Sequence, residues 1–129
     1  MSSEKQIAAL TLGAQSEDEV CRFIEARGYL VLERNYRTRF AEIDIIAHHG
    51  DTLVFIEVKS RSSMHRGSPA EAVGIAKQKK ITAGAMQYIR ERSMGDIRMR
   101  FDVATLIWMG GKCHVELYPH AFRAWEYKN

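Results

Sequence analysis

Cysteine, proline and long hydrophobic runs are all scarce in this 129-residue sequence. Its two cysteines, Cys21 and Cys113, lie far apart and show no Cys-x-x-Cys spacing, so neither a disulfide framework nor a zinc ribbon is indicated. No apolar run approaches the ~18 residues of a membrane-spanning helix, and no signal-peptide pattern opens the chain. We therefore expect a cytoplasmic protein with no membrane partner.

The composition is that of an ordinary globular domain. Hydrophobic residues make up 46% of the chain and charged residues 27%, which argues against intrinsic disorder. The length predicts one domain over residues 1–129 with a single core. The net charge of +3 is a mild indication of acidic partners such as nucleic acid. The sequence has no glycine-rich phosphate-binding loop and no recognisable serine-nucleophile arrangement.

The ends of the chain carry little pattern. Residues 1–12 are expected to form a short leader that could include a helical turn. Ser16 and Glu19 then give a capping-box pattern that predicts the start of the first helix, and Gly28 is a suitable residue to end it. The C-terminal tail, residues 119–129, is expected to hold at most one further helical turn.

Apolar alternation and turn signals predict five strands and a second helix. The predicted helix begins at Ser68, because a serine suited to the N-cap is followed by a proline at the first helical position and an acid at the third. It runs to about Arg92. An HHGD turn and a Gly-Gly pair each predict a hairpin. The strands are expected over residues 29–32, 42–47, 53–59, 97–108 and 113–117.

The predicted element order is therefore α-β-β-β-α-β-β. The strand that ends near residue 59, the second helix and the strand near residue 101 form a crossover, which joins parallel strands. The other connections are hairpin-like. We expect an α/β fold with a mixed central sheet flanked by helices.

Two of these strands carry charged side chains in their middle, in the stretch FAEIDIIAHHGDTLVFIEVKSR over residues 40–61. If the HHGD turn is centred between Gly50 and Asp51, Asp44 faces Glu57 and Glu42 faces Lys59. Strict alternation places these four side chains on one face of the sheet. The opposite face then carries Ile43, Ile45, Val54, Ile56 and Val58.

Facing residues on paired strands have Cβ atoms about 4.5–5.5 Å apart, so the carboxylates of Asp44 and Glu57 repel each other unless one takes up a proton. A Mg²⁺ or Mn²⁺ ion bound to both would remove the repulsion, because such ions take oxygen ligands. Lys59 could then orient a water or stabilise charge on a phosphate. Asp44, Glu57 and Lys59 are thus candidate catalytic residues for phosphodiester hydrolysis. The alternative is a solvated sheet face with a Glu42–Lys59 surface ion pair, worth under about 1 kcal/mol.

Other basic residues could bind the substrate backbone. Arg34, Arg37 and Arg39 alternate with aromatic residues and could form a phosphate-binding edge. Arg61 and Arg66 flank the loop after the second acidic strand. Lys77 lies on the apolar stripe of the second helix and could reach either the acidic face or a phosphate. The alternatives are solvated surface arginines and a snorkelling lysine.

The acidic pattern resembles a known nuclease signature. Asp44 followed by Glu57-Val58-Lys59 resembles the D…(D/E)xK motif of the restriction-endonuclease-like superfamily. Most of the chain is similar to the YraN-like family of small uncharacterised bacterial proteins, which are predicted nucleases related to Holliday junction resolvases. The similar segments are the Glu17 helix, Gly28-Tyr29, Arg34-Asn35-Tyr36-Arg37, Glu42-Ile43-Asp44, Phe55-Ile56-Glu57-Val58-Lys59, the Lys77 helix and Arg100-Phe101-Asp102-Val103.

The resemblance implies a restriction-endonuclease-like fold and a metal-dependent nuclease acting on DNA, with branched or flapped structures as candidate substrates. It also implies that Glu17 lies near the metal. Because resolvase-like relatives work as two-fold homodimers, a homodimer is a further expectation. One departure is Ala41, where the family usually has glycine before Glu-Ile-Asp. Two other functions stay open: a nucleic-acid-binding module without catalysis, and a scaffold whose acidic face meets another protein.

Overall fold

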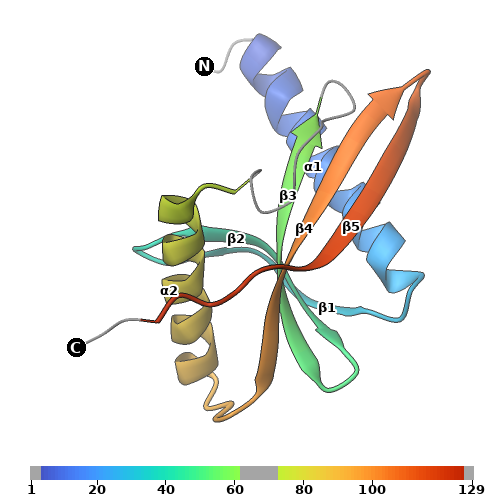
Figure 1. Cartoon of the computed structure of the whole chain (residues 1–129). Helices are drawn as coiled ribbons and strands as arrows, with labels where there is room; N and C mark the ends of the chain where they lie inside the picture. The colour runs from blue at the N-terminus through green and yellow to red at the C-terminus, as the bar shows by residue number, and fades with distance from the viewer. Residues whose placement is uncertain (1–3, 62–72, 127–129) are drawn as a thin grey trace.

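A computed structural model describes the backbone of residues 4–61 and 73–126, with side chains from Gly13 onward within those ranges. It confirms the predicted order and a mixed α/β architecture (Figure 1). The elements are α1 (Glu4–Glu25), β1 (Leu30–Arg37), β2 (Glu42–His49), β3 (Thr52–Arg61), α2 (Ile75–Glu91), β4 (Arg98–Met109) and β5 (Lys112–Phe122). No helix within the described residues is both long enough and apolar enough to cross a membrane.

The five strands form one sheet in the order β1-β2-β3-β4-β5. The pairing of β3 with β4 is parallel, as the predicted crossover through α2 requires, and the other three pairings are antiparallel. The Gly-Gly pair between β4 and β5 is also confirmed as a hairpin, because Gly110 and Gly111 both have positive φ, 58° and 74°.

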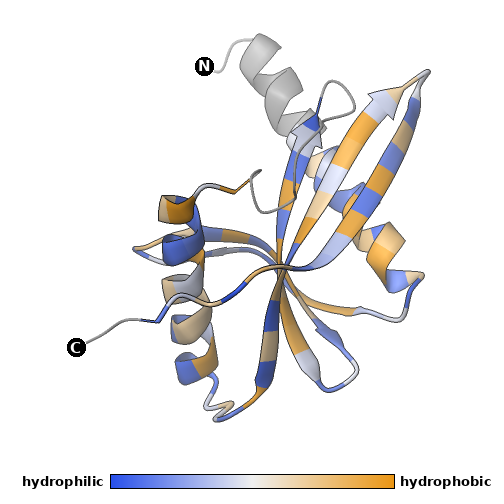
Figure 2. Ribbon diagram, in the orientation of Figure 1, coloured by the Kyte–Doolittle hydropathy of each residue, from blue (hydrophilic) through white to orange (hydrophobic). Residues whose placement is uncertain are grey.

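Each face of the sheet carries its own apolar core, and Figures 1 and 2 show α1 and α2 covering opposite faces. Large aliphatic and aromatic side chains fill both cores. The α2 side is built mainly from Tyr36, Ile43, Ile46, Leu53, Phe55, Ile81, Tyr88 and Phe101. The α1 side is built mainly from Val20, Ile24, Ile45, Ala47, Val54, Ile56, Ala104 and Leu106.

The first helix starts earlier than predicted. It begins at Glu4, so the segment expected as a leader is helical from Glu4 onward, and Ser16 lies inside the helix instead of capping it. Ser16 is buried, and its Oγ lies 3.2 Å from Oγ of Ser60 in β3. The capping-box pattern misled because its residue types also suit a helix interior that docks on a sheet. The predicted end is confirmed by Gly28, whose φ is +88°.

The second helix starts later than predicted. It begins at Ile75, with Gly74 as its N-cap residue, and ends at Glu91. The predicted start at Ser68 lies outside the described residues, and the extended backbone of Gly74 rules out one continuous helix from Ser68 to Arg92.

Both edge strands are longer than predicted and both are interrupted. β1 includes Arg34 and Arg37, which were expected in a connection, but Leu32 has no partner in β2 and Asn35 has a φ of +53°. β5 continues through Pro119 to Phe122, so the helical turn expected in the tail is wrong. The register of β5 shifts around His120, whose φ is +53°.

A buried ion pair supports the α1 side of the sheet. Asp102 is fully buried, and Nε of Arg100 lies 3.0 Å from its Oδ1. Arg100 also donates a hydrogen bond to the hydroxyl of Tyr29. Burial raises the pKa of Asp102, although Arg100 and the backbone amide of His120 act in the opposite direction. The sequence pattern Arg-x-Asp in β4 is thus structural.

Candidate active site

The carboxylate of Glu57 is buried in the sheet, yet two cations reach it. The residue is 5% exposed, although charged residues are seldom buried without a partner. Lys77, from the first turn of α2, forms an ion pair and a hydrogen bond with Oε1 of Glu57. Nζ of Lys59 lies 3.7 Å from the same oxygen. This burial contradicts the alternative of a solvated sheet face.

Asp44 lies beside Glu57, at the end of the β2–β3 ladder. The pairs run from His49–Thr52 to Ile45–Ile56, which confirms the predicted register. One step beyond the last pair, Oδ2 of Asp44 accepts a hydrogen bond of 2.8 Å from the backbone N–H of Val58. The carboxylate of Asp44 is thereby held against β3.

The two carboxylates interact electrostatically. Burial, and then the negative charge of Glu57, raise the pKa of Asp44 to about 7. The hydrogen bond from Val58 and the charge of Lys77 oppose this rise, while Glu17 adds to it. Burial lowers the pKa of Lys77, but the hydrogen bond and charge of Glu57 outweigh it, and the pKa is raised. Burial and the neighbouring carboxylate of Glu57 thus both disfavour the charged form of Asp44.

The predicted alternation of β2 is wrong at one residue. Ile43 was expected on the same face as Ile45, but Ile43 packs in the core on the α2 side and Ile45 in the core on the α1 side. The switch occurs at Asp44, beyond the last β2–β3 pair and next to the left-handed Asn35 of β1. The regular alternation of side chains between the two faces of the sheet is therefore broken at Asp44. This irregularity lets its side chain turn toward β3.

Glu17 approaches the site from α1, where Arg34 and Asn35 hold its carboxylate. Its Oε2 accepts hydrogen bonds from Asn35 Nδ2 at 3.0 Å and from Arg34 Nη2 at 3.3 Å. Its negative charge contributes to the raised pKa of Asp44. Among the side chains that the structure describes, no three His, Cys, Asp or Glu residues are close enough together to hold a metal ion. Glu17 thus acts on the site through charge.

The structure does not gather the predicted arginines into one edge. Arg34 forms an ion pair of 2.7 Å with Asp18 of α1, and Arg37 lies 3.5 Å from Glu42. Among the described residues Lys59 pairs with Glu57 and not with Glu42, the partner that the alternative required. The neighbouring Tyr36 is buried and donates a hydrogen bond to Glu91, so it offers no stacking surface.

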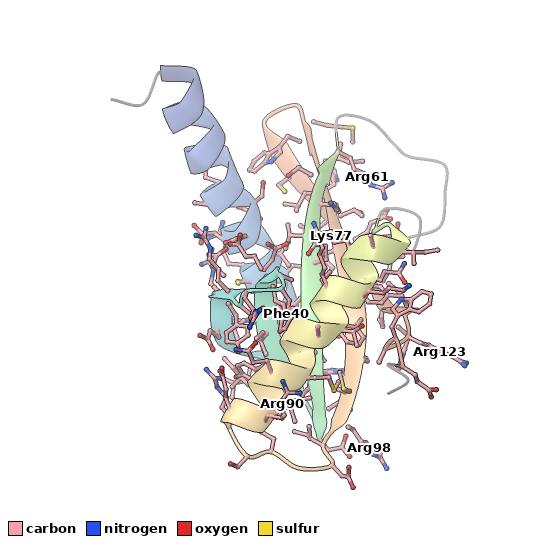
Figure 3. All side chains as sticks on the ribbon, turned by 90° about the vertical axis from the view of Figure 1, so that its left-hand side faces the viewer. Phe40, Arg61, Lys77, Arg90, Arg98 and Arg123 are labelled. Carbon is pink, nitrogen blue, oxygen red and sulfur yellow. The ribbon has the colours of Figure 1, made fainter. Side chains whose placement is uncertain are left out.

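The other predicted cations lie nearer α2 and the end of β3. Arg61 ends β3 and Arg39 lies in the β1–β2 turn, while Arg66 is outside the described residues. Figure 3 shows Phe40, Lys77 and Arg61 on the side of the molecule that carries α2. Lys79 and Lys80, which were not predicted as site residues, line a cleft with Arg39. The signal for them was the KQKK run that opens α2.

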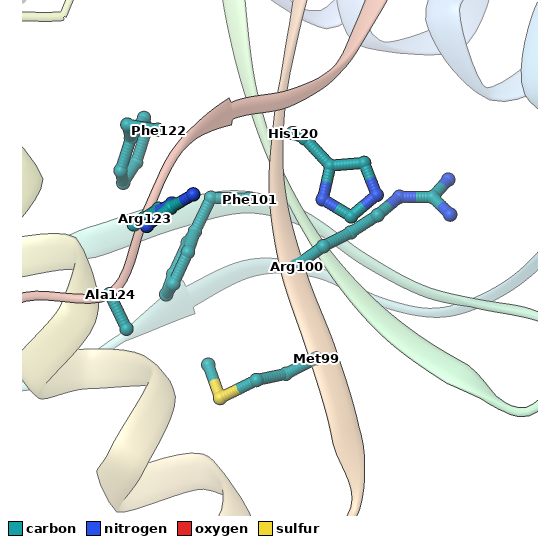
Figure 4. A pocket seen from close by; sticks show the side chains of 7 residues that line it. All are labelled: Met99, Arg100, Phe101, His120, Phe122, Arg123 and Ala124. Carbon is teal, nitrogen blue, oxygen red and sulfur yellow. The ribbon is translucent and has the colours of Figure 1, made fainter.

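A second concavity lies away from the carboxylates, where β5 ends beside β4. It has a volume of about 400 Å³. Figure 4 shows Arg100 and His120 on one side of β4 and Met99 and Phe101 on the other. Because Arg100 is already paired with the buried Asp102, it is not available to a ligand there. Polar groups do not converge in this concavity as they do around Glu57.

Comparison with known proteins gives one consistent result. The model of "Uncharacterised protein family UPF0102" matches residues 16–106. A UPF0102 protein from Desulforapulum autotrophicum is 46% identical over 95% of this chain and 98% of its own length. One from Rhodococcus opacus is 43% identical over 88% and 97%, and one from Dictyoglomus turgidum is 40% identical over 86% and 96%. None of these names states an activity.

Proposed function

This chain belongs to the uncharacterised protein family UPF0102, and we propose that it is a divalent-metal-dependent nuclease that hydrolyses phosphodiester bonds in DNA. The observation that carries the proposal is the buried Glu57 carboxylate beside Asp44, with Lys59 on the same strand. The element order and the position of Asp44 and Glu57 on the neighbouring strands β2 and β3 also support a restriction-endonuclease-like fold.

The side chains fit a divalent cation. Burial and the nearby charge of Glu57 raise the pKa of Asp44, and a bound cation would favour the charged form of this carboxylate. Mg²⁺ and Mn²⁺ prefer oxygen ligands, and Mg²⁺ commonly uses one or two protein carboxylates. Asp44 and Glu57 would supply these oxygens. When bound, the ion would polarise the phosphate and lower the pKa of a bound water.

Lys59 and Lys77 have different tasks in this proposal. Lys77 is the closer partner of Glu57 and neutralises it in the metal-free protein. Lys59 is farther from Glu57 and 32% exposed, so its ammonium group can turn toward a substrate. There it would stabilise the negative charge that develops on the phosphate oxygens, or hold the attacking water.

One observation favours a second candidate function, a nucleic-acid-binding module without catalysis. Both lysines approach the same oxygen of Glu57, Oε1, so this carboxylate has partners without a metal. A binding module would show affinity for nucleic acid that falls steeply with salt, and no turnover.

A cleavage assay separates the two functions. Labelled single-stranded, duplex, flapped and four-way-junction DNA, each with its RNA counterpart, would be incubated with the protein in Mn²⁺, Mg²⁺ or EDTA. We expect cleavage of DNA in the presence of either metal and none in EDTA. Salt-sensitive binding of DNA with no cleavage in either metal would leave the binding module as the better description.

The pKa of Asp44 predicts how stability depends on pH. In EDTA, the free energy of unfolding should fall as the pH rises from about 4 to about 7, because the folded protein holds a proton there that the unfolded chain has released. The decrease due to Asp44 should be about 2–4 kcal/mol. Mn²⁺ should restore stability at pH 8 but have little effect at pH 5, where the proton competes with the metal. Thermal unfolding in EDTA and in Mn²⁺ measures both effects.

Asp44→Asn is the control for this titration, because other carboxyl groups, including Asp102, also titrate. The difference in unfolding free energy between the wild type and Asp44→Asn isolates the contribution of Asp44. A difference that does not change with pH in EDTA would contradict the assignment.

A further inference from the structure

A basic cleft with an exposed aromatic ring lies between the β1–β2 turn and α2. It has a volume of about 340 Å³, and we call it the Phe40 cleft. Its lining residues are Arg39, Phe40, Lys79, Lys80 and Ala83. Figure 3 shows Phe40 beside α2, on the same side of the molecule as Lys77. Three of the five lining residues are cations and none is acidic, so the cleft suits an anionic ligand.

A compact turn holds the ring of Phe40 in the cleft. Oγ1 of Thr38 accepts hydrogen bonds from the backbone N–H groups of Phe40, at 3.0 Å, and Ala41, at 3.1 Å. The N–H of Thr38 donates to the carbonyl oxygen of Ala41 at 2.9 Å. Ala41 is not among the non-glycine residues with positive φ, so this turn does not need the family's usual glycine. The turn presents Phe40 with 44% of its surface exposed.

Gly84 brings this turn close to α2. A Cβ atom at Gly84 would lie 3.4 Å from Cδ1 of Ile43 and 3.7 Å from Oγ1 of Thr38. Both distances are ordinary van der Waals contacts, so the turn packs against α2 at this residue. Phe40 lines the same cleft as Lys79 and Lys80 of α2. The cleft is therefore a product of the packed fold, and does not depend on the fluctuations of a loop.

We propose that the Phe40 cleft binds an unpaired base and the phosphates beside it, so that the preferred substrate contains a single-stranded segment. This inference rests on the proposed nuclease function. A single exposed phenylalanine is ordinary on a protein surface, but an exposed ring in a cleft lined by cations is the combination that binds single strands, through base stacking and phosphate contacts. In a continuous duplex both faces of each base are covered by neighbouring bases, so Phe40 has no face to stack on.

The position of the cleft relative to the carboxylates suits one continuous strand. Lys80 lies three residues after Lys77 on α2, a rise of about 4.5 Å along the helix. Phe40 lies four residues before Asp44, so their Cα atoms are at most about 14 Å apart. A strand whose base stacks on Phe40 can therefore place a nearby phosphodiester bond at Asp44 and Glu57. The cleft would select the unpaired region, and the carboxylates would act next to it.

The test measures binding without cleavage. Fluorescence anisotropy in EDTA would give the affinity of labelled single-stranded and duplex oligonucleotides of equal length. Phe40→Leu should weaken single-strand binding by about 5- to 100-fold and change duplex binding by less than about 2-fold. Phe40→Trp should bind single strands at least as tightly as the wild type. Trp108→Leu, which removes a 37%-exposed aromatic residue near the far end of β4, is the matched control and should change neither affinity.

The result also separates this inference from the proposed function. Unchanged single-strand binding by Phe40→Leu, an equal loss for single strands and duplex, or no binding of either nucleic acid by the wild type would overturn the inference. If the wild type never cleaves but Phe40→Leu selectively loses single-strand binding, the Phe40 cleft stands and the nuclease proposal fails. If the wild type cleaves and Phe40→Leu keeps its single-strand affinity, the reverse holds.

Discussion

Asp44→Asn is expected to abolish metal-dependent cleavage and, in the same protein, to stabilise the metal-free fold. The amide cannot supply the negative charge that a divalent cation needs, so cleavage should fall by about 10²- to 10³-fold or more. Its oxygen can still accept the hydrogen bond from Val58, while its NH₂ group can donate toward Glu57. Removing the repulsion should raise the free energy of unfolding in EDTA at pH 8 by about 1–3 kcal/mol.

Opposite changes in activity and stability distinguish a functional carboxylate from a structural one. Cleavage rates and urea unfolding in EDTA would be measured on the same preparations. Asp51→Asn is the matched control, because this exposed carboxylate in the β2–β3 turn makes surface contacts, 3.4 Å to Arg98 and a hydrogen bond of 3.2 Å from Thr52, and it should change neither quantity appreciably. A stable Asp44→Asn variant that cleaves at the wild-type rate would remove Asp44 from the proposed chemistry. Marked destabilisation would identify it as a structural group.

Lys59→Met is expected to lower cleavage by about 10²- to 10³-fold and to leave the fold and nucleic-acid affinity nearly unchanged. Lys59 is 3.7 Å from Glu57, partly exposed, and not the nearest cation to that carboxylate. Losing it should therefore cost less than about 1 kcal/mol of unfolding free energy. Single-turnover cleavage, anisotropy and urea unfolding measure the three quantities. Persistent cleavage by Lys59→Met would leave this lysine without a role in turnover.

Lys77→Met provides the contrasting case. It removes the nearest cation from a carboxylate that is 5% exposed, and a buried charge without its partner is destabilising. Because Lys77 is itself 46% exposed, we expect a loss of about 1–3 kcal/mol, below the value for a fully buried pair. If Lys77→Met were neutral and Lys59→Met strongly destabilising, the two tasks assigned above would have to be exchanged.

Local signals in the sequence predicted the middle of the fold well. The HHGD turn determined the β2–β3 register, and the distance between β3 and β4 in the chain required a parallel crossover. The predictions were wrong where packing against a distant part of the chain outweighs the local sequence pattern. Ser16 looked like a helix cap but packs against Ser60, and the charged segment around Arg34 looked like a connection but forms an edge strand against β2. Such choices depend on partners that are distant in the chain.

The sequence predicted the central pair of the candidate site, Asp44 and Glu57, but only part of the surroundings of that pair. Register alone placed Asp44 near Glu57, and the apolar stripe of α2 placed Lys77 toward the sheet. The sequence pattern could not show that Ile43 changes face, because this depends on the left-handed backbone of Asn35 in the adjacent strand. Nor could it show that Arg34 is held by Asp18 on α1. The spacing of charges along a strand predicts neighbours within the sheet, but not the helix that covers it.

The interruptions in β1 and β5 also affect how the protein behaves in concentrated solution. These strands form the two free edges of the sheet, where unpaired N–H and C=O groups can template pairing with another chain. In β1 the extra residue Leu32 and the left-handed Asn35 break the straight edge, and in β5 the proline at 119 and the left-handed His120 do the same. Edges interrupted by an extra residue, a proline or left-handed backbone are poor templates. The sheet is thereby protected against edge-to-edge polymerisation and the aggregation that follows from it.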